Sequence, residues 1–221
     1  WDSLLPIYFA IIFLQSNVSR YKLTAQFMNR LDTKTRQKQI MDVSLNLIKE
    51  GGIQNLTMKR IAERVGISEQ AIYRHFNSKQ DILCSIIKYF NEHFENVFKS
   101  ISQIPTVEKR MSAFIDGHLA YFQANPATAA VIFSEEIFQY DSKLAQKVND
   151  LVEKRISVIS KFITLAQQEG AFRKDLNADD MAFIFLGSIR FLVTNWRLGG
   201  FKYDLTSRGA SLKKTLLNLI G

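Results

Sequence analysis

Apolar residues recur three or four positions apart along most of the chain, which is the spacing of one helix face. The first such face follows Thr33 and carries Ile40, Val43, Leu47 and Ile48. The pair Gly51-Gly52 then predicts the end of this helix, because glycine adopts the left-handed conformation without a Cβ clash. No stretch of the sequence shows the sustained alternation of a β-strand. The sequence therefore predicts an all-α protein.

The same spacing predicts further helices towards the C-terminus. They cover residues 82–104, 107–124, a short stretch after Asn125-Pro126, and residues 143–169, 178–198 and 207–220. Asn125 followed by Pro126 is typical of a helix start, since asparagine caps well and proline fits the first turn. Asn177 is the expected cap of the 178–198 helix, and Gly170 is expected to end the helix before it.

A helix-turn-helix pattern lies between Leu56 and Leu83. Thr57 is expected to cap a helix from Met58 to about Arg64, and Ser68 a second helix from Glu69 to Phe76. Between them, Gly66 occupies a turn position that requires a positive φ. The small Ala62 and the apolar Ile72 have the spacing with which two short helices cross around one small core.

The outward face of the second short helix carries side chains that suit DNA. Gln70 and Arg74 are four residues apart and share a face, where glutamine reads adenine and arginine reads guanine. Tyr73 and His75 offer donors to phosphate oxygens, and Lys59 and Lys79 flank the unit at phosphate-clamping positions. A helical hairpin with a merely solvated polar face remains the alternative at this point.

Net charge favours a polyanionic partner. The chain carries a formal charge of +8 and has a pI near 9.5. About half of this excess falls in residues 28–82, which hold ten Lys and Arg against six Asp and Glu. The partner would be nucleic acid or an anionic membrane surface. The alternative interpretation of the positive charge is a solvated basic surface that binds no partner.

The helix-turn-helix segment resembles the DNA-binding domain of the TetR family of bacterial repressors. The residues that carry the resemblance are Gly52, Leu56-Thr57, Ile61-Ala62, Val65 to Ser68, Ile72 to Phe76 and Ser78-Lys79. It covers residues 33–83 and weakens after Leu83. The resemblance implies DNA contacts at Thr57, Lys59, Gln70, Ala71, Tyr73, Arg74, His75 and Lys79. The first helix departs from any fixed pattern, so Lys34, Arg36 and Lys38 are assigned only a general attraction to phosphate.

The resemblance also implies a domain plan: residues 30–83 form the three-helix DNA-binding domain, and residues 84–221 form a helical ligand-binding and dimerisation domain. The expected assembly is a homodimer on a palindromic operator in double-stranded DNA, paired through the last two helices. The apolar residues expected in this interface are Ile184, Leu192, Leu212, Leu216 and Leu219.

The body after residue 84 is rich in phenylalanine, which permits an apolar cavity although such residues are usually core. The candidate ligand contacts are Phe94, Phe114, His118, Tyr121, Phe122 and Phe162. His118 is four residues from Phe114 and is the expected polar group of the site. Because the same faces show little convergent charge, we expect a small apolar ligand and neither a cofactor nor a metal.

Residues 1–29 differ from the rest and are interpreted as an extension of doubtful origin, with Met28 as a candidate native start. Residues 4–14 are apolar throughout, but this stretch is too short to cross a bilayer, which takes about 20 residues. Three interpretations stay open: an extension foreign to the native protein, an extra helix packed on the body, or a membrane-associated segment.

The favoured function is that of a repressor released from its operator by the ligand, located in the cytoplasm with the nucleoid. An enzyme is not expected, because the sequence has no phosphate-binding glycine loop, no H-E-x-x-H and no G-x-S-x-G. The single cysteine, Cys84, excludes an internal disulfide and fits a reducing compartment. The alternatives are a DNA-binding protein of chromosome organisation without a ligand switch, and a membrane-tethered interaction protein.

Overall fold

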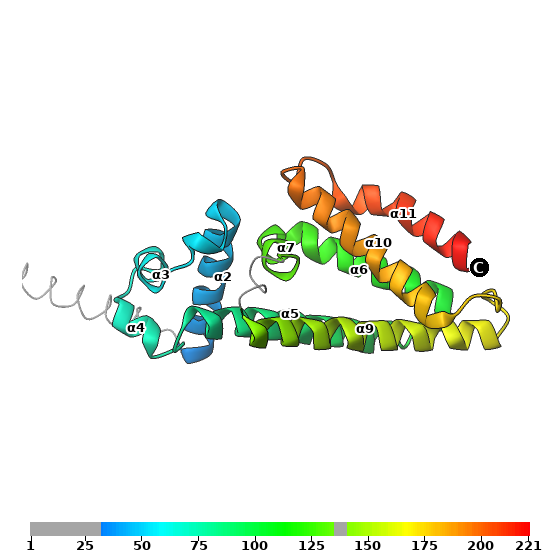
Figure 1. The fold of residues 1–221 in the computed structure, drawn as a ribbon, viewed down its shortest axis with the longest axis horizontal. Helices are drawn as coiled ribbons and strands as arrows, with labels where there is room; N and C mark the ends of the chain where they lie inside the picture. The colour runs from blue at the N-terminus through cyan, green and yellow to red at the C-terminus, as the bar shows by residue number, and fades with distance from the viewer. Residues whose placement is uncertain (1–31, 135–140) are drawn as a thin grey trace, which may run out of the picture. The chain divides into compact units, whose positions relative to one another are not determined.

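The computed structural model describes residues 32–134 and 141–221, and every regular element in these ranges is helical (Figure 1). The elements are α2 (Thr33–Gly51), the 3₁₀ turn η1 (Ile53–Asn55), α3 (Met58–Val65), α4 (Glu69–Tyr73), α5 (Lys79–Ile101), α6 (Val107–Ala124), α7 (Pro126–Ile132), α9 (Ser142–Gln168), α10 (Ala178–Leu198) and α11 (Leu205–Ile220). The predicted all-α class is confirmed. The interpretations of residues 1–29 lie outside the described residues.

The chain divides into two units between Gln39 and Ile40, and the second unit, residues 40–221, is compact. The second unit contains the helix-turn-helix and the whole helical body.

Capping side chains set the starts of the helices in the DNA-binding region. The side-chain oxygens of Thr57, Ser68 and Ser78 each accept a hydrogen bond from a backbone N–H three residues ahead, each at 3.2 Å. These bonds satisfy donors that the first turn of a helix leaves without an intrahelical partner. The capping roles predicted for Thr57 and Ser68 are confirmed.

The second short helix is shorter than the sequence predicts. It ends at Tyr73 rather than Phe76, because the N–H groups of His75 and Phe76 both bond to the carbonyl of Ile72, at 2.8 and 3.0 Å. Arg74 nevertheless keeps right-handed helical backbone angles. Its side chain therefore still follows the helical path set by Gln70.

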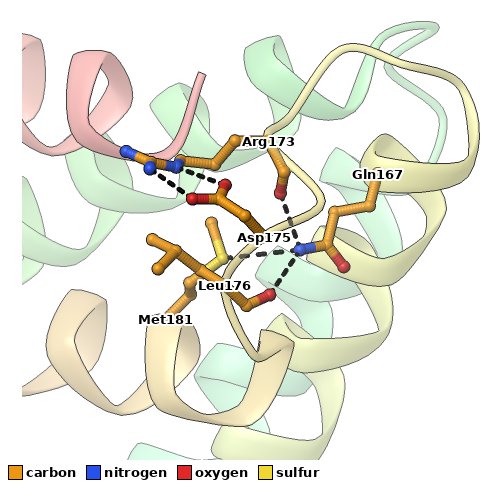
Figure 2. Close-up of polar contacts among 5 residues, drawn as sticks. All are labelled: Gln167, Arg173, Asp175, Leu176 and Met181. Atoms are coloured by element: carbon orange, nitrogen blue, oxygen red, sulfur yellow. Dashed lines mark hydrogen bonds and ion pairs between the residues drawn. The ribbon is translucent and has the colours of Figure 1, made fainter.

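The body packs α9 against α10 and α6 against α11, and α9 runs along α5 (Figure 1). Its core is aromatic and aliphatic, with Phe114, Phe122, Phe185 and Ile159 fully buried. Figure 2 shows the connection between α9 and α10, where the Gln167 side-chain amide donates to two carbonyls of the connecting loop.

Helices α6 and α11 approach closely and are linked by polar contacts. A Cβ atom on Gly209 would lie 1.9 Å from a methyl carbon of Leu119, so any larger residue here would force the buried Leu119 side chain to move. Lys213 of α11 pairs with Asp116 of α6 at 2.7 Å. The Asp204 carboxylate caps α11 and also accepts from the side chain of Gln123 on α6.

Acidification is expected to weaken this link. Hydrogen bonds from the Ser207 backbone, the Thr206 hydroxyl and Gln123 hold the pKa of Asp204 well below its usual value. The carboxylate therefore stabilises the fold at any pH above the usual aspartate pKa, and this contribution is lost as pH falls below that value. Thermal melts of the wild type and of Asp204→Asn across acidic pH check this. Asparagine keeps a neutral cap, so the difference between the two melting temperatures should shrink as pH falls, and a constant difference would contradict the assignment.

Candidate DNA-binding surface and ligand cavity

The helix-turn-helix holds α4 through a small buried core. Ile61 and Ala62 of α3 and Ile72 of α4 are buried, with exposed fractions of 3% or less. Gly66 has a φ of 77° between the two helices, and its N–H bonds to the carbonyl of Ala62 at 2.9 Å. The positive φ predicted for this glycine is confirmed. This frame fixes the direction in which the remaining residues of α4 point.

The predicted DNA-contacting residues occupy the accessible part of this frame. Gln70, Tyr73 and Arg74 are exposed, with Tyr73 48% accessible despite its apolar ring. Ala71 and His75 are half-buried behind them. Thr57 and Lys59 are exposed at the start of α3, and Lys79 is exposed at the start of α5. The structure thus gathers the predicted residues at α4 and at the first turns of the two helices beside it.

One basic residue of α3, Arg64, forms an ion pair within the protein. Arg64 makes two hydrogen bonds to the Glu50 carboxylate, at 2.9 and 3.1 Å. This pairing raises the pKa of Arg64 and lowers that of Glu50. Arg60, which the sequence analysis missed, lies exposed beside Lys59 and adds positive charge there. Its position directly after Lys59, in the first turn of α3, could have indicated from sequence that Arg60 is a further candidate for phosphate contact.

The body contains a cavity of about 130 Å³ bounded by α6, α7, α9 and α10. Most of its wall is apolar, with residues such as Ile132, Val152 and Leu186. Three polar residues also line it: His118, Arg155 and Arg190. An apolar cavity with a few polar groups is the usual form of a small-molecule site.

Of the six predicted ligand contacts, His118 alone reaches the cavity wall. Phe94, Phe114 and Phe122 are almost fully buried and surround the His118 ring, with centroids 4.6, 5.4 and 5.1 Å away. They therefore act as core that supports the histidine. The other two lie elsewhere: Tyr121 stacks on His93, and Phe162 lies beneath the guanidinium of Arg110.

His118 is neutral at physiological pH. Burial lowers the pKa of its imidazole well below the usual value, and the nearby positive charge of Arg155 lowers it further. Its Nδ1 atom is buried and has no hydrogen-bond partner among the described residues. Buried polar atoms normally have a hydrogen-bond partner, so this one is available to a bound ligand or water.

The cavity is lined by more charged residues than the sequence predicts. Arg155 lies on the apolar side of α9, close to Leu151, Val152 and Ile159. Its guanidinium carbon is 4.6 Å from the ring centroid of Phe90. The expectation of little convergent charge is therefore wrong for this site. In the sequence, Arg155 stands out as an arginine within an apolar helical stripe, which could have indicated a charged group in the cavity. An arginine at such a position usually extends its charged end to water, so the pattern alone does not predict burial.

A second surface of the body is apolar and exposed. On α10, Ile184, Phe191 and Leu198 follow a seven-residue spacing and are 57%, 72% and 73% exposed. Phe191 shares a surface groove with Leu212 of α11. Leu216, in contrast, is only 3% exposed and belongs to the core, so its expected place in a dimer interface is wrong.

None of the helices in the described part of the chain is both long and apolar enough to cross a membrane.

Comparison with known proteins matches both parts of the second unit. A family model described as "Bacterial regulatory proteins, tetR family" matches residues 40–86. A second, described as "YsiA-like protein, C-terminal region", matches residues 87–219. The chain is 25% identical to the fatty acid metabolism regulator protein of Bacillus subtilis, over 84% of this chain and 95% of the relative. It is 24% identical to the nucleoid occlusion factor SlmA of Alteromonas mediterranea, over 75% of this chain and 83% of that protein.

Solved structures give the same assignment. The regulator FadR from Bacillus subtilis, in complex with stearoyl-CoA, superposes with a TM-score of 0.73 at 26% identity, covering 83% of this chain and 99% of that one. FadR from Bacillus halodurans shares the fold, with a TM-score of 0.74 at 24% identity over 82% of this chain and 94% of its own. Both of these solved structures are of regulators. With the family models covering residues 40–219 almost continuously, the chain belongs to the TetR family of bacterial regulatory proteins and is a DNA-binding transcriptional regulator.

Proposed function

We propose that the protein is a homodimeric repressor that reads a palindromic operator with α4 and leaves it when a ligand fills the cavity of the body. The observation that carries the proposal is the exposed face of α4, on which Gln70 and Arg74 project from a rigid frame. In this assignment residues 30–83 bind DNA and residues 84–221 bind the ligand and the second subunit.

The predicted DNA-binding residues fall into two groups, those that contact bases and those that contact the DNA backbone. Gln70 and Arg74 read base edges in the major groove, because their side chains can each form paired hydrogen bonds with one base. The remaining predicted contacts position the helix on the backbone, and they are Thr57, Lys59, Ala71, Tyr73, His75 and Lys79. Such contacts fix the register but carry little sequence information.

The apolar face of α10 and α11 supports the dimer. Three large apolar side chains at seven-residue spacing, each more than half exposed, form a stripe along α10 that a monomer would leave in water. Pairing across a two-fold axis buries the same face of both subunits. The dimer then presents two copies of α4, and an operator fits when they are about 34–36 Å apart.

The cavity supports the ligand switch. Its apolar wall suits a hydrophobic body, and the Bacillus subtilis relative was solved with stearoyl-CoA. At about 130 Å³ the cavity is smaller than the roughly 300–1,000 Å³ of common ligand sites. A larger ligand therefore binds better to a state in which α9 and α10 move apart. Such a ligand shifts the dimer population towards that open state. By linkage, the factor by which the ligand lowers DNA affinity equals the factor by which bound DNA lowers ligand affinity.

Thermal melting and operator binding test the proposal together. A hydrophobic ligand should raise the melting temperature and weaken operator affinity, typically by about 5–150-fold in couplings of this kind. A charged metabolite without an apolar part as the sole effector would contradict it. DNA binding that no compound alters would instead favour the SlmA-like alternative of chromosome organisation.

Filling the cavity should remove the response. Gly187 of α10 lines the cavity at an exposed position, and a Cβ atom there would meet no heavy atom within 4 Å. Gly187→Leu is expected to occupy part of the cavity and abolish ligand binding while operator affinity is kept. Gly187→Ala is the matched control, because alanine stabilises the helix by about 1 kcal/mol and leaves most of the cavity free. Ligand titrations followed by melting temperature decide the matter, and equal responses of the two variants would place the ligand elsewhere.

A further inference from the structure

The guanidinium of Arg155 has two donors that nothing in the described part of the chain accepts. Its Nε and Nη2 atoms are buried and make no hydrogen bond to the described residues. The guanidinium lies over two aromatic rings, with its carbon 4.6 and 4.8 Å from the centroids of Phe90 and Phe94. Burial lowers the pKa of Arg155 to about 10, so the group remains charged at neutral pH. A buried cation with free donors is costly unless an anion joins it.

The two free donors form one edge of the guanidinium. The same protein shows what this edge binds: Arg173 uses its Nε and Nη2 atoms to hold the two carboxylate oxygens of Asp175, at 2.8 and 2.6 Å (Figure 2). This paired geometry is the one with which arginine recognises planar acids. At Arg155 none of the described residues accepts from this edge, and the residue lines the cavity.

We propose that Arg155 is the anion anchor of the cavity and that the ligand is a free carboxylic acid with an apolar body. This inference rests on the proposed ligand switch and narrows its ligand. The acid binds the free edge of Arg155, and the apolar body lies along residues such as Val152 and Leu186. The neutral His118, in the same wall, adds a polar contact.

The geometry disfavours a coenzyme A thioester at this anchor. The thioester carbonyl is a neutral group with one oxygen, so it leaves the charge of Arg155 uncompensated. In coenzyme A the pantetheine arm separates the phosphates from the thioester, so an acyl chain that lies along the cavity wall does not bring a phosphate to Arg155. An aliphatic alcohol has the apolar body but no charge. Three compounds with one chain length thus separate the cases: decanoic acid, decan-1-ol and decanoyl-CoA.

The test uses the full-chain protein and measures melting temperature and operator release with each compound. In the wild type, decanoate should raise the melting temperature and release DNA, and decan-1-ol should do so at least tenfold more weakly. Arg155→Met should lose the decanoate response. Without ligand this variant should melt as high as the wild type or higher, because it removes a buried charge that pairs with none of the described residues. A purely structural arginine would give a lower melting temperature instead.

Two further variants sharpen the result. Arg155→Lys keeps the charge and loses the paired edge, so it should bind decanoate more weakly than the wild type. Arg173→Met removes an arginine whose edge is already occupied, and it should respond as the wild type does. If decanoyl-CoA or decan-1-ol releases DNA equally from the wild type and Arg155→Met, the ligand switch stands and the anchor is refuted. If no compound acts on any variant, the switch fails as well.

An internal counter-ion is the remaining rival. Glu135 and Glu136 belong to residues 135–140, outside the described residues. The double variant Glu135→Gln/Glu136→Gln should leave both the melting temperature and the decanoate response unchanged. If it lowers the melting temperature in the wild type but not in Arg155→Met, the arginine is paired within the protein, and the proposal is overturned.

Discussion

Arg74→Ala is expected to weaken operator binding strongly and to relax the preference at one base position in each operator half. A paired arginine–guanine contact contributes about 1–3 kcal/mol of discrimination. In a dimer both copies of α4 lose this contact, so the loss of binding free energy on the whole operator is twice the loss for one half. Folding should be unaffected, because the Arg74 side chain is exposed at the end of α4.

Lys79→Ala is the matched comparison, since Lys79 is also basic and exposed but lies at the start of α5. A phosphate contact should weaken all sequences alike and reduce the salt dependence by about one unit for each operator half. Binding titrations on an operator and on single-base variants, each at several salt concentrations, separate the two roles. If neither substitution alters affinity at moderate salt, α4 is not the recognition helix.

Phe191→Glu is expected to dissociate the dimer into folded monomers. The side chain is 72% exposed in the isolated chain, so the charge is tolerated in a monomer. In the dimer each copy would bury an unpaired carboxylate, at an effective cost of several kcal/mol per ion. Even about 4 kcal/mol in total weakens association about a thousandfold. Light scattering at low micromolar concentration measures the change, and circular dichroism shows that the helices persist.

Two substitutions of leucine by glutamate control this experiment. Leu165 of α9 is 44% exposed and lies outside the α10–α11 face, so Leu165→Glu should remain dimeric. Leu216 of α11 is 3% exposed, so Leu216→Glu should unfold the monomer rather than separate folded subunits. A dimeric Phe191→Glu protein would move the interface to another surface.

Local rules made the DNA-binding half of the chain readable from sequence. The caps at Thr57 and Ser68 and the positive φ of Gly66 depend on neighbouring backbone groups alone, and the structure confirms all three. The end of α4 was misjudged because the carbonyl of Ile72 accepts two N–H groups in a tight turn. Sequence spacing does not distinguish that turn from one more turn of helix.

The ligand half depends on contacts between distant segments and was harder to predict. Leu212, Leu216 and Leu219 share one helical spacing, yet only Leu216 is buried, because α11 lies close to α6 at Gly209. Composition favoured phenylalanine as cavity wall, but those rings fill the core behind His118. The cavity that Arg155 lines forms between α6, α7, α9 and α10, and the spacing of residues along the chain does not show how these helices meet.

Sequencing the DNA that the purified protein retains from a random duplex pool tests the central claim most directly. At ~0.15 M ionic strength, non-specific attraction between exposed charges is partly screened. The account predicts enrichment of an inverted repeat whose half-site centres lie about one helical turn, or a multiple of it, apart, and loss of this enrichment in Arg74→Ala. Retention of DNA without any preferred sequence, or recovery of the same repeat by Arg74→Ala, would contradict recognition of an operator by α4.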